Sequence, residues 1–301
     1  PEYLTYVLWA VTPEGRATNL GELQVNDDDG KLETTTELQA FALLVTAEAG
    51  EEGGTAAGDA QAIDVARLTL GLVYAEQEEW RQAEEMLEPL LDAGDEETRV
   101  RAAVHLAEVL HRSGRSDQAL DLLERRQEES PALLGKRVEI LLREGDVRRA
   151  EKLLVKSGKG GDLGAALELV GVFHGQELYR ETLPVLENLA AEHGQAIEPQ
   201  FLLGAAAERT GDTARAARAF ERVLALEPNH APTLNYLGYM WADRSQNLER
   251  AVEMIERAVA LDPDNGAYVD SLGWAYYRMG NYVEAREKLE RAVELVPEDP
   301  V

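Results

Sequence analysis

Histidine is the side chain that most often ligates zinc or moves protons in catalysis, and this chain holds five of them. None stands in a His-Glu-x-x-His arrangement, which would put two imidazoles on one face of a helix. His105 and His111 share one predicted helix, but their spacing points them to different faces. The full set is His105, His111, His174, His193 and His230. We therefore predict no metal, no cofactor, no catalytic residue and no enzyme activity.

Two glycine-containing segments are similar in composition to ligand-binding loops. Asn26 to Gly30 gathers carboxylates before a glycine, but it lacks the ligand spacing and the closing bidentate glutamate of a calcium loop. Gly158 to Gly161 contains a lysine among glycines, but it lacks the preceding strand and the serine or threonine of a phosphate loop. We predict a hairpin turn at the first segment and a flexible connection at the second.

The elements that would position any site come from a unit of about 34 residues that repeats from Asp64 onward. In its clearest copy, the last, a first helix carries a Leu-Gly pair that includes Gly273, and Gly280 ends that helix. A second helix then carries Ala285 and Leu289 on one face. Gly273 and Ala285 are small enough to let the two antiparallel helices approach closely, and Leu289 fills the space beside them.

The same pattern recurs upstream, with Leu-Gly pairs that end at Gly71, Gly204 and Gly238. The third and fourth copies fit more loosely. Pro89 and Pro184 lie inside apparent second helices, where the missing N–H should bend the helix or shift its start. Seven copies result, at residues 64–97, 100–130, 131–162, 163–196, 197–230, 231–265 and 266–299, after a predicted linker at 49–63.

This order of Leu-Gly, aromatic residue, alanines and closing proline resembles the tetratricopeptide repeat family, over residues 64–299. The resemblance implies a mostly α fold, an α-solenoid of about seven helix-turn-helix repeats. It also implies a concave, protein-binding face lined by the first helices, at Asn235, Tyr239, Asp243, Asp270, Trp274, Tyr277 and Arg278. In earlier copies the same positions are Leu68, Leu72, Val104, Glu108, Phe201 and Ala205. Trp274 and Tyr239 are of the type that anchors interfaces, or they only pack between adjacent repeats.

Residues 1–48 have the composition of strands rather than helices. β-branched and aromatic residues gather in four stretches, at 3–11, 17–25, 32–38 and 41–48. We predict a small antiparallel β segment, a thin sheet with little core of its own. Either this sheet packs on the first repeat, or another chain completes it.

The same segment resembles part of the extracytoplasmic β-sandwich of anti-sigma-K factors. The matching residues are Tyr6, Leu8, Trp9, Gly15, Leu20, Gly21, Thr46, Glu48, Gly53 and Gly54. The strands that usually follow are replaced here by the repeats, and related modules are fused to other bacterial surface proteins, so a regulatory role does not carry over. The resemblance implies a bacterial protein outside the cytoplasm, in the periplasm, at the cell surface or extracellular.

The net charge of the chain limits the classes of partner that it is expected to bind. With 57 acidic and 30 basic side chains, the net charge is −27. A phosphate backbone would be repelled, which argues against nucleic acid and anionic membranes. No run approaches the roughly 20 apolar residues that span a bilayer, and no signal segment or initiating Met is present, as in a processed chain or an excised fragment. Cysteine is absent, which excludes disulfides and thiolate chemistry.

The two ends of the predicted solenoid suggest self-assembly. The sequence stops just after the second helix of the seventh copy, so the face that a further repeat would cover is expected to be open. This predicted assembly end consists of Ala285, Leu289, Ala292 and Val293. The other end offers a sheet with unpaired edges, and a head-to-tail contact between the two ends would grow into a fibre.

Three functions are compatible with these features. The first is a noncatalytic protein–protein interaction scaffold, which binds other proteins or assembles its own copies into a homo-oligomer or filament. The second is an adaptor that presents client proteins to an envelope enzyme such as a protease, in which case the surface around Trp274 would matter more than the ends. The third is a regulator whose β segment senses or sequesters a partner, although the sequence contains no transmembrane segment to carry a signal.

Overall fold

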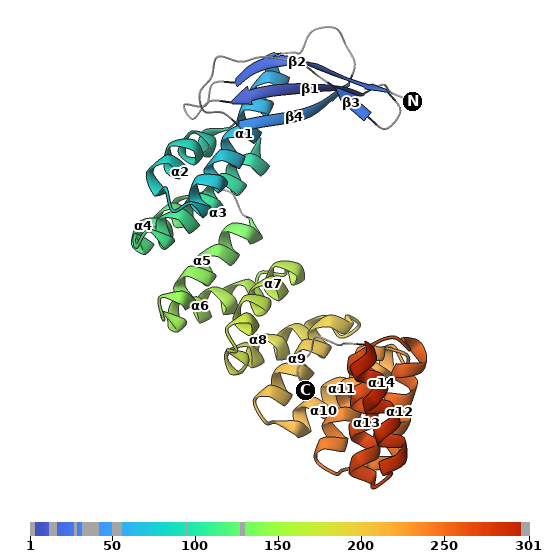
Figure 1. Cartoon of the computed structure of the whole chain (residues 1–301). Coiled ribbons are helices and arrows are strands. Elements are labelled where there is room, and N and C mark those ends of the chain that lie inside the picture. Colours follow the sequence, from blue (N-terminus) through green and yellow to red (C-terminus); the bar gives the residue numbers. More distant parts are fainter. Residues whose placement is uncertain are drawn as a thin grey trace. The chain divides into compact units, whose positions relative to one another are not determined.

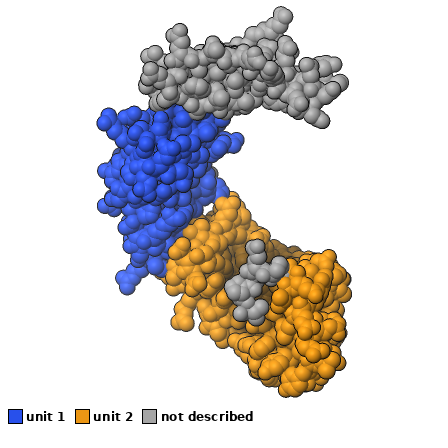
Figure 2. Space-filling view, viewed as in Figure 1, with its two compact units in different colours: residues 1–150 blue, residues 151–301 orange. Residues whose placement is uncertain are grey.

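The computed structural model describes residues 4–11, 17–26, 29–31, 42–49, 56–93, 95–126 and 130–295, with side chains from residue 63 onward. The chain divides into two compact units, residues 1–150 and 151–301, which Figure 2 colours separately. Strands come first along the chain, and the other described elements are helices (Figure 1).

The four strands form one antiparallel sheet at the start of unit 1 (Figure 1). They are β1 (Leu4–Val11), β2 (Ala17–Asn26), β3 (Asp29–Lys31) and β4 (Ala42–Ala49), in the spatial order β3-β2-β1-β4. Strands β2 and β4 contact the first helix, α1 (Ala56–Glu76). The strand that the sequence predicts at 32–38 lies outside the described residues.

The described helices form seven pairs, and the turn within each pair falls inside one of the seven predicted repeats. Odd-numbered helices are the first helices of the pairs and even-numbered helices are the second. In unit 1 they are α1, α2 (Trp80–Leu87), α3 (Glu96–Arg112), α4 (Ser116–Arg125) and α5 (Pro131–Arg143), while α6 (Val147–Gly158) spans the boundary between the units. In unit 2 they are α7 (Leu163–Gly175), α8 (Tyr179–Glu192), α9 (Ile197–Arg209), α10 (Thr213–Leu226), α11 (Ala231–Asp243), α12 (Leu248–Leu261), α13 (Gly266–Met279) and α14 (Tyr282–Leu295).

The glycines of the Leu-Gly pairs lie where the two helices of a hairpin touch. A Cβ built on Gly273 would stand 2.7 Å from Cγ of Leu289, and one built on Gly71 would stand 2.7 Å from Cγ of Leu87. Real Cβ atoms do not approach this closely, so a larger residue at either position would force the leucine to shift. The prediction that Gly273 allows close approach and that Leu289 fills the space beside it is confirmed.

Turns and caps explain why the helices begin and end where they do. Gly280 ends α13 with φ of 86°, a left-handed conformation that favours glycine over other residues. At the other end of α13 the side chain of Asn265 accepts a hydrogen bond from the backbone N–H of Tyr268. Asp95, Asp162 and Asp212 cap α3, α7 and α10 in the same way.

Pro89 and Pro184, the two prolines expected to disturb second helices, act differently. Helix α2 ends at Leu87 and the chain continues as a short 3-10 helix, η1 (Glu88–Asp92), which has Pro89 in its first turn. Pro184 instead lies inside α8, which continues through it to Glu192. Because proline has no N–H, Pro184 removes one hydrogen bond from the ladder of α8, whereas Pro89 lies in the first turn of η1, where an N–H has no partner within the helix.

Helix α1 begins earlier than the sequence predicts. Its first residue, Ala56, lies inside the segment 49–63 that was expected to be a linker. The run around it contains four alanines, at Ala56, Ala57, Ala60 and Ala62, and alanine has the highest helix propensity of all residues. Their combined preference outweighs the single Gly58.

Candidate protein-binding surface

The predicted binding residues are brought together by two neighbouring first helices of unit 2. Helix α11 carries Asn235, Tyr239 and Asp243, and helix α13 carries Asp270, Trp274, Tyr277 and Arg278. The two helices contact each other although a second helix, α12, separates them in sequence. We call the surface formed by these seven residues the α11–α13 face.

Three carboxylates act on the neutral phenol of Tyr239 on this face. Its side chain is 43% exposed. Partial burial raises the pKa of its phenol, and the negative charges of Asp243, Asp270 and Glu208 raise it further. These carboxylates come from α11, α13 and α9, so three successive first helices contribute charge around one aromatic ring. Glu208 was not among the residues predicted from the sequence.

Trp274 and Tyr277 form the aromatic part of the face. Their rings are stacked, with centroids 5.5 Å apart and an angle of 24° between the planes. Tyr277 is 49% exposed and also contacts the ring of Tyr282 at 5.6 Å. Arg278 places its guanidinium 5.5 Å from the Trp274 ring centroid and donates a hydrogen bond to Oγ of Ser245 at 2.7 Å.

Two polar atoms of the α11–α13 face are buried without a hydrogen-bond partner among the described residues. They are Oδ1 of Asn235, an acceptor, and Nε1 of Trp274, a donor. A buried polar atom that lacks a partner costs about 1–3 kcal/mol relative to one that has found it.

The corresponding positions of three earlier copies have different surroundings. Phe201 packs against Phe220 and Tyr236, with ring centroids 5.9 and 5.6 Å away, so it fills the space between adjacent repeats. Leu68 is buried. Glu108 occupies the repeat position of Tyr239 and Trp274, but Lys136 and Arg143 neutralise it, with N–O distances of 3.1 and 3.0 Å.

The predicted assembly end is partly wrong. Ala285 and Ala292 were expected to be open to water, but they are 2% and 7% exposed. Leu289 packs beneath Gly273. These residues lie on the face of α14 that packs on α13, as Ala251 and Ala258 do on α12, so the repeat pattern marks contacts within the hairpin. Val293 is 54% exposed, and Tyr282 and Val283 are also exposed.

Three of the five histidines have structural partners. Nδ1 of His111 lies 2.9 Å from Oγ of Ser116, and Nε2 of His174 lies 3.0 Å from Oγ1 of Thr182. His230 caps α11 by accepting a hydrogen bond from the backbone N–H of Thr233. Within the described residues, no three histidines, aspartates or glutamates stand close enough to share a metal ion. In the same part of the chain, no helix combines the length and apolar character needed to cross a membrane.

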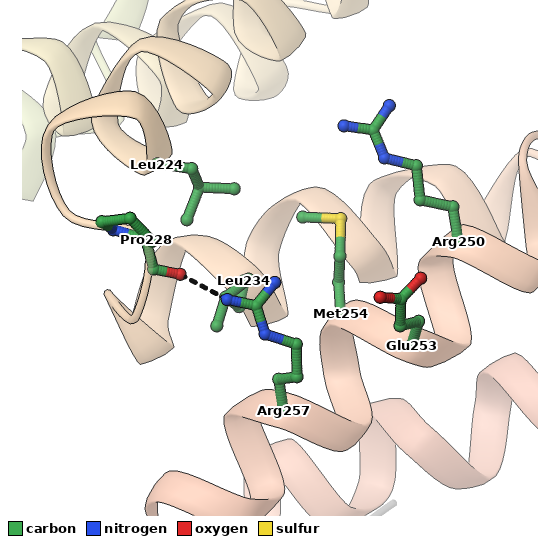
Figure 3. A pocket seen from close by; sticks show the side chains of 7 residues that line it. All are labelled: Leu224, Pro228, Leu234, Arg250, Glu253, Met254 and Arg257. Atoms are coloured by element: carbon green, nitrogen blue, oxygen red, sulfur yellow. Dashed lines mark hydrogen bonds between the residues drawn. The ribbon is translucent and has the colours of Figure 1, made fainter.

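A small pocket lies between the fifth and sixth helix pairs, and none of the seven residues of the α11–α13 face lines it. It has a volume of about 170 Å³ and is lined by Leu224, Pro228, Leu234, Arg250, Glu253, Met254 and Arg257 (Figure 3). Arg257 reaches across to the carbonyl oxygen of Pro228, to which it donates a hydrogen bond of 2.7 Å. Sites for small molecules usually exceed about 300 Å³, so this pocket is too small for that role.

Comparison with known proteins points to one family. The family model described as tetratricopeptide repeat matches residues 68–133, 201–266 and 242–300. A crystal structure of MamA is 20% identical, covers 55% of this chain and 95% of its own, and has a TM-score of 0.45. YrrB, described as a TPR protein with an unusual peptide-binding site, is 18% identical, covers 60% and 93%, and has a TM-score of 0.44. No curated protein matches the sequence at a significant level.

Proposed function

Since the chain belongs to the tetratricopeptide repeat family, whose domains bind proteins, we propose that it is a noncatalytic protein-interaction scaffold that holds a segment of a partner on the α11–α13 face. The observation that carries this proposal is the set of aromatic rings that this face presents to solvent. Tyr239 and Tyr277 are both more than 40% exposed, and the ring of Trp274 stacks on that of Tyr277. Aromatic side chains of this kind supply much of the binding energy in protein interfaces.

Replacing both Tyr239 and Tyr277 with alanine tests this proposal. The double variant should bind partner proteins from a source-cell extract at least about tenfold more weakly, since aromatic anchors each contribute upwards of about 1–2 kcal/mol. Leu261→Ala is the matched control, because Leu261 is an exposed apolar residue of α12 outside the face. Quantitative pull-down with circular dichroism as a check of folding gives the measurement. Undiminished binding by the double variant would rule out this face.

A second proposal is that copies of the chain associate through α14. It is supported by the exposed apolar residues Val283 and Val293 of this helix. Val283→Asp with Val293→Asp should then lower the mass measured by light scattering over a concentration series. The Tyr239 and Tyr277 variant should leave that mass unchanged. Head-to-tail growth into a fibre is the extended form of this proposal, and negative-stain imaging tests it.

The location and the adaptor role also belong to the proposal. The resemblance of residues 1–48 to an extracytoplasmic module is the support for a bacterial protein outside the cytoplasm. As an adaptor for an envelope enzyme, the chain would lose client capture in the Tyr239 and Tyr277 variant but not in the α14 variant. As a self-assembling scaffold, the chain would lose self-association in the α14 variant but not in the Tyr239 and Tyr277 variant.

A further inference from the structure

Guanidinium groups lie over aromatic rings at several places in this chain. Every tryptophan whose side chain is described has one. The pairs are Arg112 over Trp80 at 5.2 Å, Arg250 over Trp241 at 4.9 Å and Arg278 over Trp274 at 5.5 Å. A cation over a ring is attracted by the negative face of the π system.

No such cation lies over the ring of Tyr239 among the described residues, although negative charge surrounds that ring. Its ring is exposed, and no described lysine or arginine lies over it. Two of the carboxylates that act on it, Glu208 and Asp243, form no ion pair with a described side chain. A cation at this place would meet an aromatic face and uncompensated negative charge together.

The corresponding position in unit 1 shows how the chain neutralises such charge elsewhere. Glu108 stands at the same repeat position as Tyr239, and it is paired with Lys136 and Arg143. Both cations also pair with Glu139. Negative charge is therefore balanced internally on this face of unit 1, whereas around Tyr239 the described residues leave Glu208 and Asp243 unpaired.

We propose that Tyr239, Glu208 and Asp243 together bind an arginine or lysine side chain in a basic segment of a partner protein. The side chain would lie on the Tyr239 ring, with its charge toward the two carboxylates. The occupant is basic because of charge complementarity, and it is a protein segment because this inference rests on the function proposed for the α11–α13 face. An acidic segment would be repelled from the same place.

The test uses fluorescently labelled peptides of equal length, in which arginine, citrulline or glutamate alternates with glycine and serine. Citrulline keeps the shape of arginine and removes its charge. Binding to the full chain is measured by fluorescence anisotropy. The arginine peptide should bind, the citrulline peptide should bind about tenfold more weakly, and the glutamate peptide should not bind.

Charge-matched variants separate this site from the general negative charge of the protein. Glu208→Gln with Asp243→Asn should weaken binding of the arginine peptide about tenfold. Glu221→Gln with Glu249→Gln removes the same charge from exposed positions on α10 and α12, and should leave binding nearly unchanged. An equal loss in both variants would overturn the proposal, because binding would then reflect net charge alone.

The outcomes also distinguish this inference from the proposed function. If the citrulline peptide binds as tightly as the arginine peptide, and Tyr239→Ala with Tyr277→Ala abolishes both, the basic preference is wrong while the binding face stands. If the arginine peptide does not bind but the double tyrosine variant still loses its partner proteins, the preference is again wrong. If no peptide binds and that variant keeps its partners, both fail.

Discussion

Tyr276 shows how a single contact on α13 shifts an ionisation. Its hydroxyl donates a hydrogen bond of 2.6 Å to Oε1 of Glu256 on α12. Burial, together with this hydrogen bond and the charges of Glu256, Glu284 and Glu287, raises its pKa from 10 to about 12. The neutral phenol is therefore favoured in the folded chain.

Because the folded pKa of Tyr276 is raised, its contribution to stability is fully present below about pH 10 and is lost as the pH rises toward about 12. We expect the last phase of a spectrophotometric tyrosine titration to disappear in Tyr276→Phe. Glu256→Gln should move that phase to lower pH, since it removes the negative charge. An unchanged titration in both variants would contradict the assignment.

The pKa of His174 is shifted in the opposite direction to that of Tyr276. Burial lowers its pKa, and Nε2 must donate to Oγ1 of Thr182, because the Thr182 hydroxyl itself donates to the carbonyl oxygen of Tyr179 at 2.8 Å. With a lowered folded pKa, its contribution to stability is present above the unfolded value of 6.5 and is lost as the pH falls through the folded value. Urea unfolding at about pH 7 and about pH 5 should show a smaller difference for His174→Gln than for the natural chain.

At the scale of the helical hairpin, the crossing glycines are the strictest positions. A Cβ on Gly238 would stand 2.6 Å from Cγ1 of Ile255 and 2.9 Å from the backbone oxygen of Ala251, which cannot rotate away. Gly238→Ala should therefore destabilise the chain by about 1–3 kcal/mol in urea unfolding. Gly171→Ala is the control, because nothing lies within 4 Å of its Cβ in α7, and alanine should stabilise that helix by about 0.5–1 kcal/mol. Similar effects at both sites would contradict the packing argument.

Neighbouring hairpins are linked by a recurring arginine that the sequence pattern does not indicate. Arg126, Arg222 and Arg257 each donate to a carbonyl oxygen near the end of the preceding hairpin, at Leu91, Gly194 and Pro228 respectively. Each contact joins residues about one repeat apart, so the arginines hold successive hairpins together.

Arg257→Met keeps most of the side-chain volume and removes the donor to Pro228. We expect a loss of about 1 kcal/mol in the free energy of unfolding, since a hydrogen bond from a charged group is worth about 1.5–3 kcal/mol and this one is exposed. Arg286→Met should be neutral, because Arg286 is largely exposed and only 3.8 Å from a Glu290 oxygen. An equal loss in the control would show that the arginine side chains, rather than the carbonyl contact, are responsible.

For the whole molecule, the dominant electrostatic feature is the net charge of −27. Self-repulsion of this size opposes a compact state, and salt screens it. Thermal unfolding should therefore shift to higher temperature as sodium chloride is raised from low to physiological ionic strength and beyond. A fall in the midpoint would mean that surface ion pairs such as those of Glu108 contribute more than the repulsion does.

The sequence by itself determined the repeat and the hairpins. Gly71, Gly204, Gly238 and Gly273 could be found by spacing because a helix crossing and the turn after it depend on residues within one repeat. The tetratricopeptide fold is confirmed, and the binding residues of α11 and α13 stay a prediction. The β-segment resemblance likewise stays a prediction.

Only the tertiary structure decided what surrounds those residues. It gathered Glu208, Asp243 and Asp270 around Tyr239 from three helices, buried Ala285 and Ala292, and paired Phe201 with Tyr236 between repeats. Each of these facts depends on how close residues of different helices lie in space. A repeat pattern records the size and polarity that each position requires, and the charge or ring that arrives from the next helix is set by packing.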